Sequence, residues 1–310
     1  MRLVYLGTPR FAAPSLEALV RAGHDIAAVY TQPDRPKGRG QQLAQSPVKE
    51  TALRLGLPVE QPERVRRPEV VERLASFGAR AMVIVGYGQI IPQSIIDFAP
   101  LGIINVHGSL LPKYRGAAPI QWAIANGERV TGVTTMRIDA GLDTGDMLLK
   151  AETGIGPEET AVELGERLAE MGAKLIVETL AGLEAGSIQP EPQDSSQATL
   201  APILKKEDGR VDWSRPAQAI HDRARGFQPW PGAYTTFRGQ QLTLYRTSVA
   251  TEANPGAPGE MVLADRRLLI RAGDGRAVEA REVQVEGKKR ISAADFLNGQ
   301  KPRPGERLGE

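Results

Sequence analysis

Apolar and polar positions define two alternating kinds of segment over the first 186 residues. Short continuous apolar runs, typical of buried strands, occupy residues 2–6, 26–30, 81–85 and 103–106. Segments with apolar residues three and four positions apart, typical of helices, occupy residues 11–22, 48–55, 117–126 and 159–183. A further strand-like run covers residues 131–138. This alternation predicts an α/β domain with a parallel-rich, Rossmann-like sheet.

The pattern changes after residue 186. Residues 187–208 lack periodicity and contain Pro190, Pro192 and Pro202 among Gln, Ser and Asp, which is typical of an interdomain linker. Beyond it, a helical segment is followed by short strand-like runs with Gly-containing turns: 217–225, then 233–237, 242–245, 260–263, 268–270 and 277–285. We therefore predict a domain at 1–186, a linker at 187–208, and a small OB-like β-barrel at 209–310.

Charge is distributed unevenly between these parts. The chain of 310 residues has a net charge of +2, but residues 1–208 carry 22 basic and 25 acidic side chains, and residues 209–310 carry 17 and 12. The cationic C-terminal part is compatible with contacts to a phosphate backbone, and also with an ordinary solvated surface.

The amino-acid composition limits the kinds of catalytic and binding site that the chain can form. The chain has no Cys, and its three His are not spaced as metal ligands, so we expect metal-free catalysis without disulfides. The first apolar run is too short for a signal peptide, and no apolar stretch reaches the length of a bilayer, which predicts a cytoplasmic protein with no membrane contact. Neither a dinucleotide fingerprint nor a P-loop motif is present.

Candidate chemistry lies where the apolar run at 103–106 ends. Asn105 and His107 are two residues apart, so their side chains point to the same side of a strand at the edge where α/β sheets keep their sites. Asp143 follows the run at 131–138, although by itself it could belong to an ordinary polar turn. An amide donor, a proton switch and a carboxylate together suit an acyl-type transfer. His24 and His221 lack such neighbours and are expected to be packed or solvated.

Three segments carry a resemblance to a known family. They read Asn-Val-His-Gly-Ser-Leu-Leu-Pro at 105–112, Arg-Gly-Ala-Ala-Pro at 115–119 and Asp-Ala-Gly-Leu-Asp-Thr-Gly-Asp at 139–146. The chain resembles the folate-dependent formyltransferases in these segments. The similarity extends over nearly the whole chain, through residues 7–12, 32–40, 205–207, 212–213 and 229–231.

The resemblance implies transfer of a formyl group from 10-formyltetrahydrofolate to the α-amine of methionine carried by initiator tRNA. Asn105 and a protonated His107 would stabilise the oxyanion of the tetrahedral intermediate. Asp143 would keep His107 charged and collect the proton of the amine, directly or through water. Because the substrate amine is the nucleophile, no Ser or Cys nucleophile is needed.

The resemblance also implies binding residues. Folate would contact Ser109, Leu110, Leu111 and Pro112, with the pterin against the backbone of residues 85–90; from spacing alone, Leu110 and Leu111 could equally be core residues. The tRNA would contact Arg35, Lys37 and Arg39 in a basic loop, and Lys206. Further phosphate contacts could come from Lys205, Arg223, Arg225, Arg238 and Arg246. Without the resemblance, the basic loop could be a solvated connection.

Other functions share parts of this evidence. A formyltransferase acting on a sugar-nucleotide amine would use the same site and have no affinity for tRNA. A hydrolase would pass the formyl group to water. A non-enzymatic RNA-binding protein would leave the α/β domain inert, which the intact Asn105, His107 and Asp143 argue against. We expect the protein to be a monomer.

Overall fold

The computed structural model describes residues 1–310 except 38–41, 253, 265, 304 and 310. Its contacts divide the chain into two compact units. The first unit comprises Met1–Gly116, Gly132–Thr153 and Gly165–Leu200. The second unit comprises Ala117–Thr131, Gly154–Leu164 and Ala201–Glu310.

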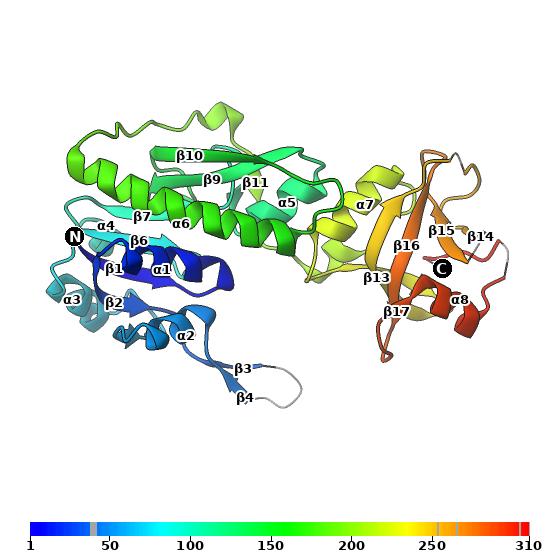
Figure 1. Ribbon diagram of the computed structural model, residues 1–310, viewed down its shortest axis with the longest axis horizontal. Helices are drawn as coiled ribbons and strands as arrows, with labels where there is room; N and C mark the ends of the chain where they lie inside the picture. The colour runs from blue at the N-terminus through cyan, green and yellow to red at the C-terminus, as the bar shows by residue number, and fades with distance from the viewer. Residues whose placement is uncertain (38–41, 253, 265, 304, 310) are drawn as a thin grey trace. The chain divides into compact units, whose positions relative to one another are not determined.

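A seven-stranded sheet in the order β10-β9-β7-β6-β1-β2-β5 organises the N-terminal part of the fold (Figure 1). Its strands are β1 (Arg2–Gly7), β2 (Asp25–Tyr30), β5 (Val59–Glu60), β6 (Ala81–Val85), β7 (Ile103–His107), β9 (Val130–Arg137) and β10 (Met147–Gly154). The pairs from β5 to β7 are parallel, and β9 is antiparallel to β7. The prediction of a parallel-rich α/β sheet is confirmed.

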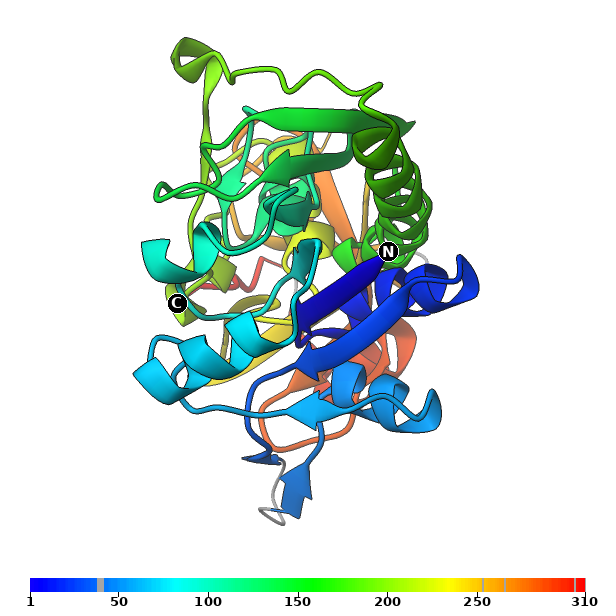
Figure 2. The same cartoon turned by 90° about the vertical axis from the view of Figure 1, so that its left-hand side faces the viewer.

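Helices cover both faces of this sheet, as Figure 2 shows, with α1 and α6 on one face and α3 and α4 on the other. The helices are η1 (Arg10–Ala12), α1 (Ala13–Arg21), α2 (Pro47–Arg54), α3 (Pro68–Ser76), α4 (Gln93–Ile96) and α6 (Ala161–Ala185). α6 lies so close to the sheet that a Cβ at Gly172 would be 2.7 Å from Val106 Cγ1 and 3.4 Å from Val133 Cγ1. This packing fixes β7, the strand that carries the candidate site.

A β-hairpin occupies part of the segment expected to be a basic loop. Strand β3 (Arg35–Lys37) pairs antiparallel with β4 (Gln42–Ala44). Asp34, at the start of the hairpin, forms a 2.6 Å ion pair with Lys49 and accepts a hydrogen bond from Gln61 Nε2 at 2.8 Å. The predicted basic loop thus contains two short strands whose backbones pair with each other, and its contact with tRNA stays a prediction.

The second unit is built on an antiparallel sheet in the order β12-β13-β16-β15-β14, with β17 on β16. Its strands are β12 (Ala233–Phe237), β13 (Gln240–Val249), β14 (Met261–Ala264), β15 (Arg267–Arg271), β16 (Ala277–Val285) and β17 (Ile291–Ser292). Helices α7 (Ala217–Gly226) and α8 (Ala293–Gln300) accompany it, and α8 and the sheet share one apolar core that includes Trp213, Leu242, Val283 and Phe296. In the part of the chain that the structure describes, β12 and β14 do not pair, so the predicted barrel is a half-barrel.

The second unit also contains residues from the first half of the chain. Helix α5 (Pro119–Ala125) packs on α7, where Trp122 and Phe227 meet edge to face with ring centroids 5.2 Å apart. Ala118, Ala125 and Leu204 complete this small core. The predicted linker is divided, since its residues up to Leu200 belong to the first unit and those from Ala201 to the second. The domain boundaries at 186 and 208 stay a prediction.

The remaining elements are short. They are β8 (Arg115–Gly116), which pairs with β11 (Leu200–Ala201), and the 3-10 helices η2 (Ser195–Gln197) and η3 (Lys206–Gly209). Within the described ranges, every helix is too short or too polar to cross a bilayer.

Candidate active site

The end of β7 positions Asn105 and His107. β7 is flanked by β6 on one side, where Ile84 pairs with Asn105, and by β9 on the other, where Thr134 pairs with His107. Strand alternation points the side chains of residues 105 and 107 to the same side. Both residues are buried, with 8% and 5% of their surface exposed.

Asp143 lies against both of these side chains. Asn105 Nδ2 donates to Asp143 Oδ1 at 3.4 Å. His107 Nδ1 lies 3.7 Å from Asp143 Oδ2, which is too long for a hydrogen bond. The structure thus brings together the three residues that the sequence selected, with a short gap between the imidazole and the carboxylate.

The second nitrogen of His107 fixes the orientation of the ring. His107 Nε2 lies 2.9 Å from the carbonyl oxygen of Tyr114. A carbonyl can only accept, so Nε2 carries a proton and donates it. The nitrogen that remains for exchange with a substrate is Nδ1, on the side of Asp143.

The backbone around Asp143 is conformationally unusual and well anchored. Asp143 and Tyr114 both have positive φ, 52° and 63°. The Asp143 carboxylate accepts from the backbone N–H of Gly116 at 2.9 Å, and its carbonyl oxygen accepts from Gln193 Nε2 at 2.8 Å. Sequence reasoning missed both contacts: Gln193 is 50 residues away in the chain, in a segment without periodicity.

The segment predicted to line a folate site is tied to β9. Thr134 Oγ1 donates to the Ser109 carbonyl oxygen at 2.7 Å and accepts from the Leu111 N–H at 3.1 Å. The Ser109 hydroxyl donates to the Lys113 carbonyl oxygen at 2.6 Å. Ser109 and Leu111 are buried, while Leu110 and Pro112 are partly exposed. A ligand bound at this segment would therefore contact the side chains of Leu110 and Pro112 and the backbone of the segment.

The turn after β6, expected to face the pterin, is also held in place. The Tyr87 carbonyl oxygen accepts from Thr8 Oγ1 at 3.0 Å and from Gln32 Nε2 at 3.1 Å. Burial raises the pKa of the Tyr87 phenol. Gly86 has φ +55° and a Cβ there would lie 2.9 Å from Pro9 Cγ, so the turn requires glycine at this position. Ile90 is 92% exposed.

The residues predicted to bind tRNA lie in two places. Arg35 is exposed on β3, and Lys37 ends that strand. Arg39 lies outside the described residues. Lys206 is exposed at the start of η3.

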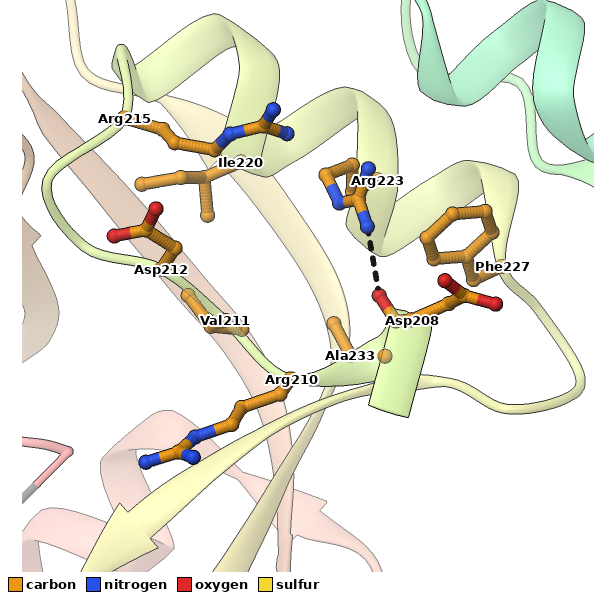
Figure 3. A pocket seen from close by; sticks show the side chains of 10 residues that line it. Asp208, Arg210, Val211, Asp212, Arg215, Ile220, Arg223, Phe227 and Ala233 are labelled. Carbon is orange, nitrogen blue, oxygen red and sulfur yellow. Dashed lines mark hydrogen bonds between the residues drawn. The ribbon is translucent and has the colours of Figure 1, made fainter. Parts of the chain in front are cut away.

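The arginines of the second unit are mostly engaged in contacts within that unit. In Figure 3, Arg223 Nη2 donates to the Asp208 carbonyl oxygen at 3.0 Å, and burial lowers the pKa of the Arg223 guanidinium. Arg225 is buried and pairs with Asp222 at 2.7 Å, so the expectation that it contacts phosphate is wrong. Arg238 and Arg246 form surface ion pairs, with Glu306 at 2.6 Å and Glu163 at 3.3 Å.

Among the described residues, no group of three or more His, Asp and Glu is placed so that it could hold a metal ion.

Comparison with known proteins agrees with this fold. The formyl transferase family matches residues 1–180, and the formyl transferase C-terminal domain matches residues 203–301. The chain belongs to the formyl transferase family. It is 70% identical over 310 residues to a protein of Solibacter usitatus named methionyl-tRNA formyltransferase, covering 100% of this chain and 99% of the relative. A protein of the same name from Koribacter versatilis is 59% identical with the same coverage.

A solved structure has a similar fold at low sequence identity. The N-formyltransferase from Helicobacter canadensis, in complex with folinic acid and dTDP-3-aminofucose, superposes with a TM-score of 0.67 at 18% identity. The match covers 90% of this chain and 98% of that one. The predicted fold class is confirmed.

Proposed function

We propose that this protein transfers a formyl group from 10-formyltetrahydrofolate to the α-amine of methionine on initiator tRNA, a step of translation initiation. The observation that carries the proposal is the convergence of Asn105, His107 and Asp143 at the end of β7. The names of the relatives from Solibacter usitatus and Koribacter versatilis support the acceptor. The folinic acid bound to the Helicobacter canadensis protein supports a folate donor.

The first chemical step is attack of the neutral amine on the formyl carbon, which places negative charge on the formyl oxygen. Asn105 Nδ2 and a protonated His107 Nδ1 supply two N–H donors to that oxygen. Each such preorganised donor is worth about 3 kcal/mol in the transition state. His107 can act in this way because its Nε2 is already bonded to the Tyr114 carbonyl oxygen, which fixes the plane of the ring.

Asp143 accepts the proton of the attacking amine. Its carboxylate takes the proton that the amine nitrogen loses, directly or through one water. The tetrahedral intermediate then collapses: the formyl oxygen re-forms its double bond, the bond between the formyl carbon and the folate nitrogen breaks, and Asp143 returns the proton to that departing nitrogen. The products are formylated methionyl-tRNA and tetrahydrofolate.

Binding is divided between two groups of residues. Ser109, Leu110, Leu111 and Pro112 contact the folate, mainly through backbone and the two partly exposed side chains. Arg35, Lys37, Arg39 and Lys206 contact the phosphates and acceptor end of the tRNA. The protein acts in the cytoplasm as a monomer.

A comparison of acceptors tests the proposal. The full chain is incubated with 10-formyltetrahydrofolate and either methionyl-tRNA, a sugar-nucleotide amine, or buffer alone. We expect formyl transfer with methionyl-tRNA only. Transfer to the sugar nucleotide, or release of formate in buffer at a comparable rate, would replace the proposal with one of those activities, and tRNA binding without turnover would make the protein an RNA-binding protein.

A further inference from the structure

The segment from residue 187 to residue 200, here called the strap, returns along the site after α6 ends. It runs beside β10, as Figures 1 and 2 show. The backbones of Glu191 and Met147 exchange two hydrogen bonds, at 2.8 and 2.9 Å. The strap is therefore anchored to the sheet just before Gln193.

Gln193 makes three hydrogen bonds with its side-chain amide. Its Nε2 donates to the carbonyl oxygens of Asp143 at 2.8 Å and Gly145 at 2.7 Å. Its Oε1 accepts from Arg115 Nε at 3.0 Å. One amide thus connects the loop that carries Asp143 with the segment that carries Arg115.

These partners leave only one orientation for the amide. Two carbonyl oxygens can only accept and a guanidinium can only donate, so the nitrogen of Gln193 must face the loop and its oxygen must face Arg115. Arg115 is 7% exposed, and its charge strengthens the bond that holds the amide in place. A carboxylate at position 193 would keep the bond to Arg115 and lose both bonds to the loop.

The Asp143 loop needs such support because of its backbone. At φ 52°, Asp143 lies in the left-handed region, which disfavours residues other than Gly, although Asp tolerates it better than most. The strap also supports the backbone that binds the Asp143 carboxylate. The Arg115 N–H donates to the Thr199 carbonyl oxygen, which lies in the strap, at 2.9 Å. The next N–H, that of Gly116, is the donor to Asp143 Oδ2.

We propose that Gln193 is a positioning residue that sets the distance between the Asp143 carboxylate and His107. It acts through the Asp143 and Gly145 carbonyl oxygens and does not touch the reacting atoms. The inference rests on the proposed function, in which Asp143 receives the proton of the amine.

The test compares Gln193→Glu and Gln193→Met in the full chain. The Glu variant retains a partner for the buried Arg115, which protects folding, and the Met variant removes all three bonds without adding charge. We expect kcat for methionyl-tRNA to fall by about 10-fold to 100-fold, because displacement of a catalytic group by roughly 1 Å has an effect of that size. KM for either substrate should change by less than about twofold. The combination of Gln193→Glu with Asp143→Asn should be no slower than Asp143→Asn alone.

The matched control is Gln197→Glu on the same strap. Gln197 is exposed, and within the described part of the chain its side-chain amide donates only to Asp194, at 2.9 Å, so its substitution should leave kcat unchanged. Equal losses from positions 193 and 197, or multiplicative losses in the double variant, would overturn the proposal.

A readout that needs no turnover separates this inference from the proposed function. The chain has three His, so the ring resonances of His107 can be followed by NMR. They should shift in Gln193→Met and not in Gln197→Met. A wild-type protein that fails to formylate methionyl-tRNA would refute the proposed function while the His107 shift still supports the positioning role; an unshifted His107 resonance would refute the positioning role itself.

Discussion

Two buried histidines, one in each unit, are held in different ways. His221, on α7, has both ring nitrogens within bonding distance of a partner: Nδ1 lies 2.9 Å from Thr247 Oγ1 and Nε2 lies 3.1 Å from the Pro157 carbonyl oxygen. His107 has one nitrogen bonded to a carbonyl oxygen at 2.9 Å, while the other stops 3.7 Å from the Asp143 carboxylate. Among the described residues, both ring nitrogens of His221 have a hydrogen-bond partner, whereas Nδ1 of His107 has none within hydrogen-bonding distance.

The carboxylates beside these two histidines, Asp222 and Asp143, also differ in how fully they are paired. Asp222 is buried and pairs with Arg225 at 2.7 Å, while Arg225 also donates to the carbonyl oxygens of Gly156 and Glu159 at 3.0 and 2.8 Å. Asp143 is held by a backbone N–H and faces an imidazole across a gap. A network in which every polar group is paired stabilises the fold. Asp143 and His107 are each fixed by a backbone group but do not bond to each other, so both can exchange protons with a substrate.

The largest expected effect comes from removing the cation of the buried pair between Asp222 and Arg225. Arg225→Ala leaves the buried Asp222 without its cation, which should lower the free energy of unfolding by about 3–5 kcal/mol. Formyl transfer measured well below the melting temperature should stay within about twofold of wild type. Chemical denaturation followed by circular dichroism gives the stability; a loss below about 1 kcal/mol would mean that the pair is not as closed as its geometry indicates.

The next effect concerns the open site. Asn105→Ala and Asp143→Ala should each lower kcat/KM by at least about a hundredfold, because each removes a group that acts in the transition state. The double variant should lose far less than the product of the two. Circular dichroism spectra like that of wild type serve as the control for folding, and activity near wild type in either variant would remove that residue from the mechanism.

The smallest effect concerns the predicted contact of Arg39 with tRNA. Arg39→Ala should reduce the slope of log affinity against log salt by roughly one, since one phosphate contact is lost, with folate affinity unchanged. The matched control is Arg246→Ala, because Arg246 already pairs with Glu163 on the surface. An unaltered slope in Arg39→Ala, or a loss of folate binding instead, would show that Arg39 does not contact the nucleic acid.

Much of the fold could be predicted because its elements have strong local patterns. The apolar runs at 81–85 and 103–106 match β6 and β7 within one residue, and 233–237 matches β12. Helix α3 was not predicted from the sequence, although its apolar residues lie three and four positions apart, as on one face of a helix. β10 was missed because its alternating half-exposed positions follow directly on a polar turn.

Local periodicity predicts only the part of the site whose residues lie close together in the chain, whereas Asp143 was selected because it follows a second strand-like run and lies in a segment that resembles the family. Asn105 and His107 share a strand, so their common direction follows from the strand's period of two. Gln193 reaches Asp143 through tertiary contacts across 50 residues, which no local pattern records. The hairpin of β3 and β4 is likewise fixed by Lys49 and Gln61 at its root, and both lie well outside the basic segment.

The central claim is that His107 is catalytic and His221 is structural, and one paired measurement tests it most directly. Single-turnover formyl transfer to methionyl-tRNA is measured for His107→Ala and His221→Ala, together with the melting temperature of each variant. We expect His107→Ala to be slower by at least about a hundredfold, and His221→Ala to keep the wild-type rate while melting at a lower temperature. A His107→Ala variant that keeps its rate, or a His221→Ala variant that loses it while remaining folded, would contradict the account.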